Sequence, residues 1–144
     1  TLKSLSNRPD SGKNNDKKIT LNVINNAEVV ANRTFIEVAL NNIIKNAIEA
    51  ARSEVKISLK KVRSSELGVQ SLERILIEIE DDGTGINDDM KDRIFEPFVT
   101  TKTNGTGLGL AIAYRIITGF GGNIIIDRSS LGGAKFKILF PAKG

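Results

Sequence analysis

The chain has 144 residues, the length of one domain, and its 40% hydrophobic and 26% charged residues are typical of a folded protein. The absence of cysteine and histidine excludes disulfides, Cys- or His-ligated metal sites and an imidazole base. The net charge is +4, but residues 1–18 carry three of these charges; with one tyrosine and no tryptophan for stacking, we expect no nucleic-acid partner. We also expect a soluble, cytoplasmic domain without membrane contact, because no signal peptide or membrane-spanning apolar run is present.

Residues 1–18 are polar, and we interpret them as a linker from an upstream segment, with the folded domain over 19–144. Alternating apolar residues predict a first strand over 19–24. Apolar residues spaced by three and four predict an amphipathic helix from about 33 to 52. Two further strands are predicted around 55–59 and 75–79, on either side of a polar stretch near 63–71.

Glycines divide the second half of the chain. After a break at Gly83 and Gly85, a short helix is predicted over 88–94. A glycine-rich segment, 105–109, leads into an apolar helix over about 110–118, and two closing strands are predicted over 124–127 and 136–140. This order predicts an α/β (α+β) two-layer sandwich, in which about three helices cover one face of a mixed, mostly antiparallel sheet.

An unusual polar stripe lies on the first predicted helix. Asn42 and Asn46 are four residues apart, so they share one helix face, and Glu49 continues it. One interpretation is a solvated polar face. The other is a row of side-chain oxygens that faces a ligand or a hard cation such as Mg²⁺.

Three more segments could form a binding site. The first, 81–86, is either a common Asp-Gly turn or a strand end whose carboxylate accepts a hydrogen bond from a ligand amino group. The second, 95–98, has two phenylalanines around Glu-Pro, which indicate core packing and an anchor for a mobile segment over 99–105. In the third, 105–110, successive N–H groups at a helix start could bind phosphate, although the spacing fits neither a Walker A nor a Rossmann motif.

In this order and spacing, the four segments resemble the ATP-binding catalytic domain of sensor histidine kinases, in the Bergerat-fold (GHKL) superfamily. Residues 42–47 resemble the N box, 81–86 the G1 box, 95–98 with 100–102 the F box, and 105–110 the G2 box. The resemblance covers about 19–142, and the short segment before the G2 box is similar to that of nitrogen-regulatory and sporulation kinases.

The resemblance implies the Bergerat fold and two cofactors, ATP and Mg²⁺. Asn46 would bind Mg²⁺, and Asn42 would lie near the phosphates. Asp81 would accept the adenine amino group, which selects ATP over GTP. The other implied nucleotide contacts are Gly83, Gly85, Ile86, Lys102, Gly105, Thr106, Gly107, Leu108, Gly109 and Leu110, with Lys102 reaching the γ-phosphate. We expect the ATP lid over 99–105, and the glycine-rich residues through 109, to be mobile without nucleotide.

Four positions differ from the common pattern of the resembled family. Glu49 stands where a basic residue is frequent, and Ala50 where an aromatic residue is frequent. Ala134 replaces a threonine, and Phe120 replaces a histidine. These differences change contacts near the nucleotide and leave all four segments in place.

The phosphate acceptor in the resembled family is a histidine on a separate helical hairpin. This chain has no histidine, and residues 1–18 are too few to form that hairpin. We therefore expect a monomeric phosphoryl-donor module without its own general base, whose direct partner is a histidine-bearing dimerisation hairpin of the parent protein and whose indirect partner is a response regulator. The alternatives are a non-catalytic nucleotide-gated interaction module, a serine kinase of the anti-sigma-factor type, and a gyrase-, MutL- or Hsp90-like ATPase, against which Asn42 argues because those enzymes place a glutamate there.

Overall fold

The computed structural model describes residues 17–24, 31–64, 72–99 and 107–142. Within these ranges the chain forms β1 (Lys18–Val23), α2 (Arg33–Ala50), β2 (Glu54–Ser64), β3 (Leu72–Asp81), α3 (Asp88–Lys91), α4 (Gly109–Gly119), β4 (Asn123–Arg128) and β5 (Ala134–Pro141). The predicted order of elements is confirmed. The linker predicted over 1–18 lies almost entirely outside the described residues and stays a prediction.

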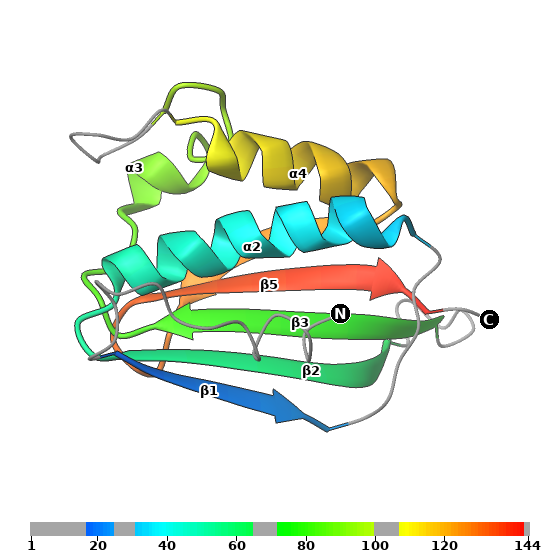
Figure 1. Cartoon of the computed structure of the whole chain (residues 1–144), viewed down its shortest axis with the longest axis horizontal. Helices are drawn as coiled ribbons and strands as arrows, with labels where there is room; N and C mark the ends of the chain where they lie inside the picture. Colours follow the sequence, from blue (N-terminus) through cyan, green and yellow to red (C-terminus); the bar gives the residue numbers. More distant parts are fainter. Residues whose placement is uncertain (1–16, 25–30, 65–71, 100–106, 143–144) are drawn as a thin grey trace.

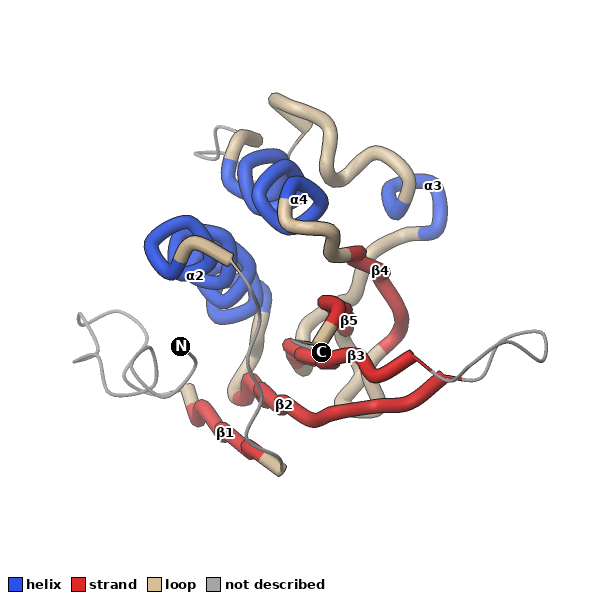
Figure 2. The backbone as a smooth tube through the Cα atoms, turned by 90° about the vertical axis from the view of Figure 1, so that its right-hand side faces the viewer, coloured by secondary structure: helices blue, strands red, loops and turns tan. Residues whose placement is uncertain are grey.

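The five strands form one sheet in the order β1-β2-β3-β5-β4. β1 and β2 are parallel, whereas the β2–β3, β3–β5 and β4–β5 pairs are antiparallel. The helices lie on one side of this sheet (Figures 1 and 2). The predicted two-layer α/β fold with a mixed, mostly antiparallel sheet is therefore confirmed.

The core lies between the sheet and the two long helices. Side chains alternate along each strand, so one set is buried under α2 and α4 and the other set occupies the uncovered face. The largest buried side chains are Phe136, Phe140, Ile43, Ile75, Ile79, Ile117 and Ile138. On the uncovered face, β3 and β5 place Glu78 opposite Lys137 and Glu80 opposite Lys135, so acidic and basic side chains lie opposite each other there.

Hydrogen bonds define one terminus of each long helix. Asn32 caps the start of α2, where its side-chain oxygen accepts a hydrogen bond from the N–H of Phe35 at 3.2 Å. α4 ends in a Schellman turn, in which the N–H of Gly122 donates to the carbonyl of Ile117 at 2.9 Å. Gly121 has a φ of +81° in that turn, which favours glycine.

Two elements differ in length from their predictions. α3 ends at Lys91 rather than Ile94 and buries no side chain, and turns follow it, in which the N–H groups of Arg93 and Ile94 both donate to the carbonyl of Met90. β2 continues to Ser64, beyond the predicted end at 59. The added part is charged, and Glu73 of β3 lies 3.4 Å from Lys61 and 3.7 Å from Arg63, so cross-strand ion pairs replace the apolar alternation there.

Candidate functional site

Asp81, the last residue of β3, carries a buried carboxylate, only 1% exposed. Its Oδ1 accepts hydrogen bonds from the N–H of Gly83 at 2.9 Å and the N–H of Ala134 at 3.3 Å. Burial raises the pKa of Asp81, against the effect of these two hydrogen bonds. Both hydrogen bonds involve Oδ1, and Oδ2 accepts neither of them. Asp81 therefore offers one fixed oxygen and one available acceptor.

The backbone packs tightly around Asp81. A Cβ at Gly83 would overlap the carbonyl oxygen of Ala50 at the end of α2, and a Cβ at Gly133 would overlap Oδ1 of Asp81. Gly85 has a φ of +80°, which favours glycine. The β3–α3 loop is thus held between the end of α2 and the β4–β5 turn.

The neighbouring Asp82 has a different role, which the sequence analysis did not foresee. Its carboxylate accepts hydrogen bonds from the hydroxyl of Ser53 at 2.6 Å and from the N–H of Arg52 at 2.8 Å, with further bonds from the N–H groups of Ser53 and Glu54. These bonds, that of the Ser53 hydroxyl foremost, hold the pKa of Asp82 well below its usual range. Asp82 therefore ties the α2–β2 connection to the β3–α3 loop. The feature of the sequence that could have indicated this role is the second carboxylate directly after the predicted strand.

The asparagine stripe of α2 runs between this loop and the start of α4. The side-chain amide of Asn42 donates to the carbonyl of Val38 at 2.9 Å, and its oxygen faces Gly109, where a Cβ would lie 2.9 Å away. Ala50 meets Gly83 at the other end of the stripe. Asn46 is partly buried, one turn after Asn42, so the predicted N-box residues lie between the G1 and G2 segments.

The two phenylalanines of 95–98 separate into different roles. Phe95 packs in the core, with its ring 5.2 Å from that of Tyr114 and 6.3 Å from that of Phe136. Phe98 is 75% exposed with a φ of +69°, and its N–H donates to the carbonyl of Gly107 at 2.9 Å. Because a Cβ at Gly107 would overlap the backbone of Phe98, the F and G2 segments are in contact.

The remaining predicted phosphate contacts are only partly described. Leu108 is 36% exposed just before α4, and Leu110 packs against the core. Lys102, Gly105 and Thr106 lie outside the described residues, as does most of the segment expected to be a mobile lid. The roles proposed for them stay predictions.

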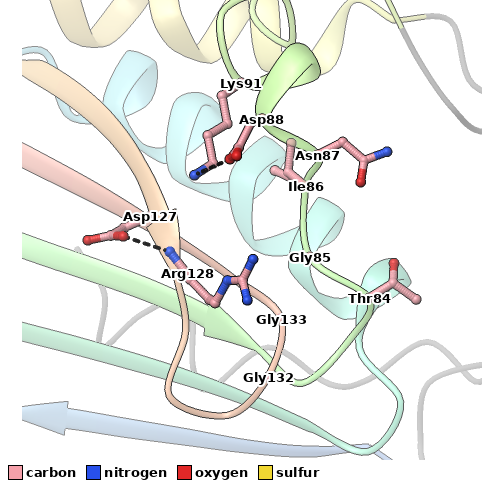
Figure 3. A pocket seen from close by; sticks show the side chains of 10 residues that line it. All are labelled: Thr84, Gly85, Ile86, Asn87, Asp88, Lys91, Asp127, Arg128, Gly132 and Gly133. Carbon is pink, nitrogen blue, oxygen red and sulfur yellow. Dashed lines mark hydrogen bonds and ion pairs between the residues drawn. The ribbon is translucent and has the colours of Figure 1, made fainter.

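A pocket of about 230 Å³ opens between the β3–α3 loop and the β4–β5 turn (Figure 3). Gly85 and Ile86 line it, whereas Asp81, Asn42 and Asn46 do not. Lys91 at its edge pairs with Asp88 at 3.1 Å. This pocket borders the loop that carries Asp81, but it is walled by the β4–β5 turn rather than by the asparagine stripe of α2.

Within the described ranges, no group of three or more Asp, Glu, His or Cys residues could hold a metal ion by itself. Over the same ranges, no helix combines the length and apolar character needed to cross a membrane.

Comparison with known proteins agrees with this geometry. Residues 31–144 match the family described as histidine kinase-, DNA gyrase B-, and HSP90-like ATPase. The chain belongs to this family. The resemblance drawn from the four sequence motifs is thereby confirmed, and this ATPase domain is an ATP-binding one.

Individual relatives are sensor kinases. The chain is 38% identical over 123 residues to the sensory histidine kinase/phosphatase NtrB of Rhizobium meliloti (strain 1021), covering 79% of this chain and 32% of NtrB. Its fold superposes on the mycobacterial sensor histidine kinase MprB with a TM-score of 0.79 at 21% identity, covering 99% of this chain and 89% of that one. Full-length ShkA in complex with AMPPNP gives a TM-score of 0.68 at 28% identity, covering 87% of this chain and 25% of ShkA. The chain thus spans about a third of NtrB.

Proposed function

We propose that this domain binds ATP and Mg²⁺ and donates the γ-phosphoryl group to a histidine on a separate dimerisation hairpin, as the catalytic part of a sensor histidine kinase. The observation that carries the proposal is the buried Asp81, whose Oδ1 is held by two backbone N–H groups while Oδ2 accepts neither of these bonds. The names of NtrB and MprB support kinase activity, and the complex of ShkA with AMPPNP, an ATP analogue, supports the nucleotide.

Asp81 reads the base in this proposal. Its free oxygen accepts a hydrogen bond from the adenine amino group, whereas guanine presents a carbonyl at that position and would set two acceptors against each other. The partly buried Ile86 contacts the face of the base, and Gly83 and Gly85 keep the loop close to it. The departures at Ala50 and Ala134 reduce the side-chain contacts available to the base.

The asparagine stripe serves the phosphates and the cation. An amide oxygen is a suitable ligand for Mg²⁺, which keeps waters and takes further oxygens from phosphates. Asn46, partly buried on the stripe, fits this use because its side chain carries such an oxygen. When bound, Mg²⁺ neutralises phosphate charge. Asn42 and the segment 107–110, which leads into α4, then bind phosphate oxygens, aided by the helix dipole. Gly105, Thr106 and Lys102 complete this set.

The acceptor lies outside this chain, which contains no histidine. We propose that residues 1–18 link the domain to a histidine-bearing hairpin in the parent protein, and that a response regulator receives the phosphoryl group afterwards. The domain positions the γ-phosphate, and the base that activates the acceptor histidine belongs with the hairpin. Because ATP is the donor, we place the domain in the cytoplasm, as a monomer when isolated.

Calorimetric titration with AMPPNP and with the matching GTP analogue, each with and without Mg²⁺, tests the nucleotide site. We expect the domain to bind AMPPNP but not the GTP analogue. Mg²⁺ should strengthen this binding, and Asp81→Asn should abolish it. Asp89→Asn is the matched control, because Asp89 is an exposed carboxylate on α3. Equal binding of both analogues, or an unchanged Asp81→Asn variant, would overturn the base-reading role.

Transfer is tested separately with labelled ATP and the histidine hairpin of the parent protein. Acid-labile label on the hairpin supports the kinase. ATP binding without any transfer would instead favour a nucleotide-gated interaction module.

A further inference from the structure

The β4–β5 turn is held by two neighbouring carboxylates of β3 that point to opposite faces of the sheet. Asp81 lies on the side of the helices and accepts a hydrogen bond from the N–H of Ala134. Glu80 lies on the uncovered face, and its Oε1 accepts a hydrogen bond from the hydroxyl of Ser129 at 2.9 Å. Ser129 is 4% exposed and Glu80 7% exposed. A buried polar pair thus lies on the opposite side of the strand from Asp81.

The direction of the Ser129 hydroxyl is fixed by its second partner. Its oxygen accepts a hydrogen bond from the N–H of Leu131 at 3.0 Å, so its single proton is directed to Glu80. The backbone of Ser129 also closes the turn, since its carbonyl accepts from the N–H of Gly132 at 3.0 Å and its N–H donates to the carbonyl of Gly133 at 2.8 Å. Ser129 therefore connects the whole turn to Glu80.

Glu80 is itself held from β5. The ammonium of Lys135 lies 3.5 Å from Oε1 of Glu80 and 3.3 Å from Oε2 of Glu78. Burial lowers the pKa of Lys135, but Glu80 and Glu78 outweigh this effect and leave the pKa raised. Ser129 is thus bonded to a carboxylate that a neighbouring charge fixes in place.

The β4–β5 turn also holds Asp81 in place. The N–H of Gly133 donates to the carbonyl of Asp81 at 3.1 Å, and the N–H of Ala134 donates to Oδ1 at 3.3 Å. No side chain fits at Gly133 beside that oxygen. A small displacement of the turn therefore changes the hydrogen bonding of the Asp81 carboxylate directly.

We propose that Ser129 and Glu80 are positioning residues that hold the β4–β5 turn so that Asp81 keeps Oδ1 engaged and Oδ2 free for the base. This inference rests on the proposed function, because it names the residues that set base selectivity at that site. The competing explanation is a clamp that stabilises the fold without affecting the base. The two explanations differ in which ligands should bind more weakly when the Ser129 hydroxyl is removed.

The test compares Ser129→Ala with Ser130→Ala, an exposed serine at the next position. Each is titrated with ATP and with purine riboside triphosphate, which lacks the exocyclic amino group. Loss of one buried hydrogen bond should weaken ATP binding about fivefold in Ser129→Ala and leave binding of the analogue unchanged. Equal loss for both nucleotides, or no loss for either, would overturn the proposal. Glu80→Gln, which keeps an acceptor oxygen, should retain most of the discrimination, whereas Glu80→Ala should lose it.

A second readout needs no nucleotide. The pKa of Asp81, followed by the ¹³C shift of its carboxyl carbon, should rise further in Ser129→Ala, because the Ala134 hydrogen bond that lowers it is weakened. The neighbouring charge of Asp82 is the same in all variants, and Ser130→Ala should match the wild type. An unchanged Asp81 pKa in folded Ser129→Ala would overturn the inference. This readout holds even if the wild type binds no ATP, a result that would count against the proposed function alone.

Discussion

Oδ1 of Asp81 and the backbone of Gly133 are in direct contact, and no side chain fits between them. The contact joins two segments more than fifty residues apart, the end of β3 and the β4–β5 turn. A carboxylate that reads a base must be oriented before the base arrives, and here backbone packing supplies the orientation. Asp81, for which we propose the base-reading role, is therefore part of the sheet's own hydrogen-bonding scheme.

Gly133→Ala should destabilise the domain by about 1–3 kcal/mol, the usual cost of overpacking, and abolish discrimination between ATP and GTP analogues. A Cβ there would overlap Asp81 and crowd the N–H of Gly83. Chemical denaturation and calorimetric titration measure the two effects. Gly119→Ala is the control, since nothing lies within 4 Å of a Cβ at Gly119, and its stability should be unchanged or higher. A Gly133→Ala protein with wild-type stability and selectivity would contradict this packing.

Asp81→Asn should raise the stability of the nucleotide-free domain at neutral pH, although it removes nucleotide binding. Burial raises the folded-state pKa of Asp81, so the folded state favours the protonated form, and stability falls as pH rises from the ordinary value of about 3.9 through the raised value. Asparagine carries no charge and keeps an oxygen for Gly83 and Ala134. Urea denaturation of both proteins between pH 4 and pH 7 should show the stability difference growing with pH. A difference that shrinks with pH would reverse the sign of the argument.

Asp82→Asn should destabilise the domain at neutral pH. The hydroxyl of Ser53 and the N–H groups around it lower the folded-state pKa of Asp82, so its stabilisation is present above about pH 4, the ordinary value, and is lost as pH falls towards the lowered value. The thermal unfolding temperature of the wild type should therefore fall more steeply below pH 4 than that of the variant. Asp89→Asn should follow the wild-type curve.

Asn46→Ala should remove most of the Mg²⁺-dependent increase in AMPPNP affinity and leave the Mg²⁺-free affinity nearly unchanged. The reason is that Asn46 supplies an oxygen to the cation rather than to the base in the proposed site. Asn41→Ala, a partly buried asparagine on the same helix one position off the stripe, is the matched control. Titrations over a series of Mg²⁺ concentrations measure the effect, and equal losses in the two variants would refute the assignment.

Hydrogen exchange tests the mobility predicted for the lid. The amide of Phe98 is hydrogen-bonded to the carbonyl of Gly107, so we expect it to be protected in the nucleotide-free protein. Amides from 103 to 106 should exchange rapidly and become protected when AMPPNP and Mg²⁺ are added. Strong protection of 103–106 before nucleotide is added would show that no mobile lid exists.

The elements followed directly from the sequence because their patterns are local. Apolar spacing along α2 and alternation along β5 identify a buried face whatever else packs against it. The lengths of α3 and β2 were less predictable. α3 stops early because it buries nothing, and β2 extends because Glu73 pairs with charged residues across the strand.

The candidate site was only partly predictable, because several of its contacts join residues that are far apart in the sequence. The segment 81–86 could be identified because carboxylates and two glycines follow a strand, and the choice of Asp81 within it rests on the family resemblance. Ser129 and Glu80 could not, because the bond between them joins residues 49 positions apart and nothing in either local sequence indicates it. The anchoring of Asp82 to Ser53 is also a tertiary contact.

One rigid helix touches both ends of the proposed site. Asn42 meets the start of α4, and Ala50 meets the loop of Asp81, so eight residues of α2 separate the two contacts by about 12 Å. The helix fixes the distance between the base end and the phosphate end of the proposed site. If the proposed site is correct, a ligand with a shorter or longer span would lose one of the two contacts, so we expect α2 to favour ligands of one length, independently of the role proposed for Asp81.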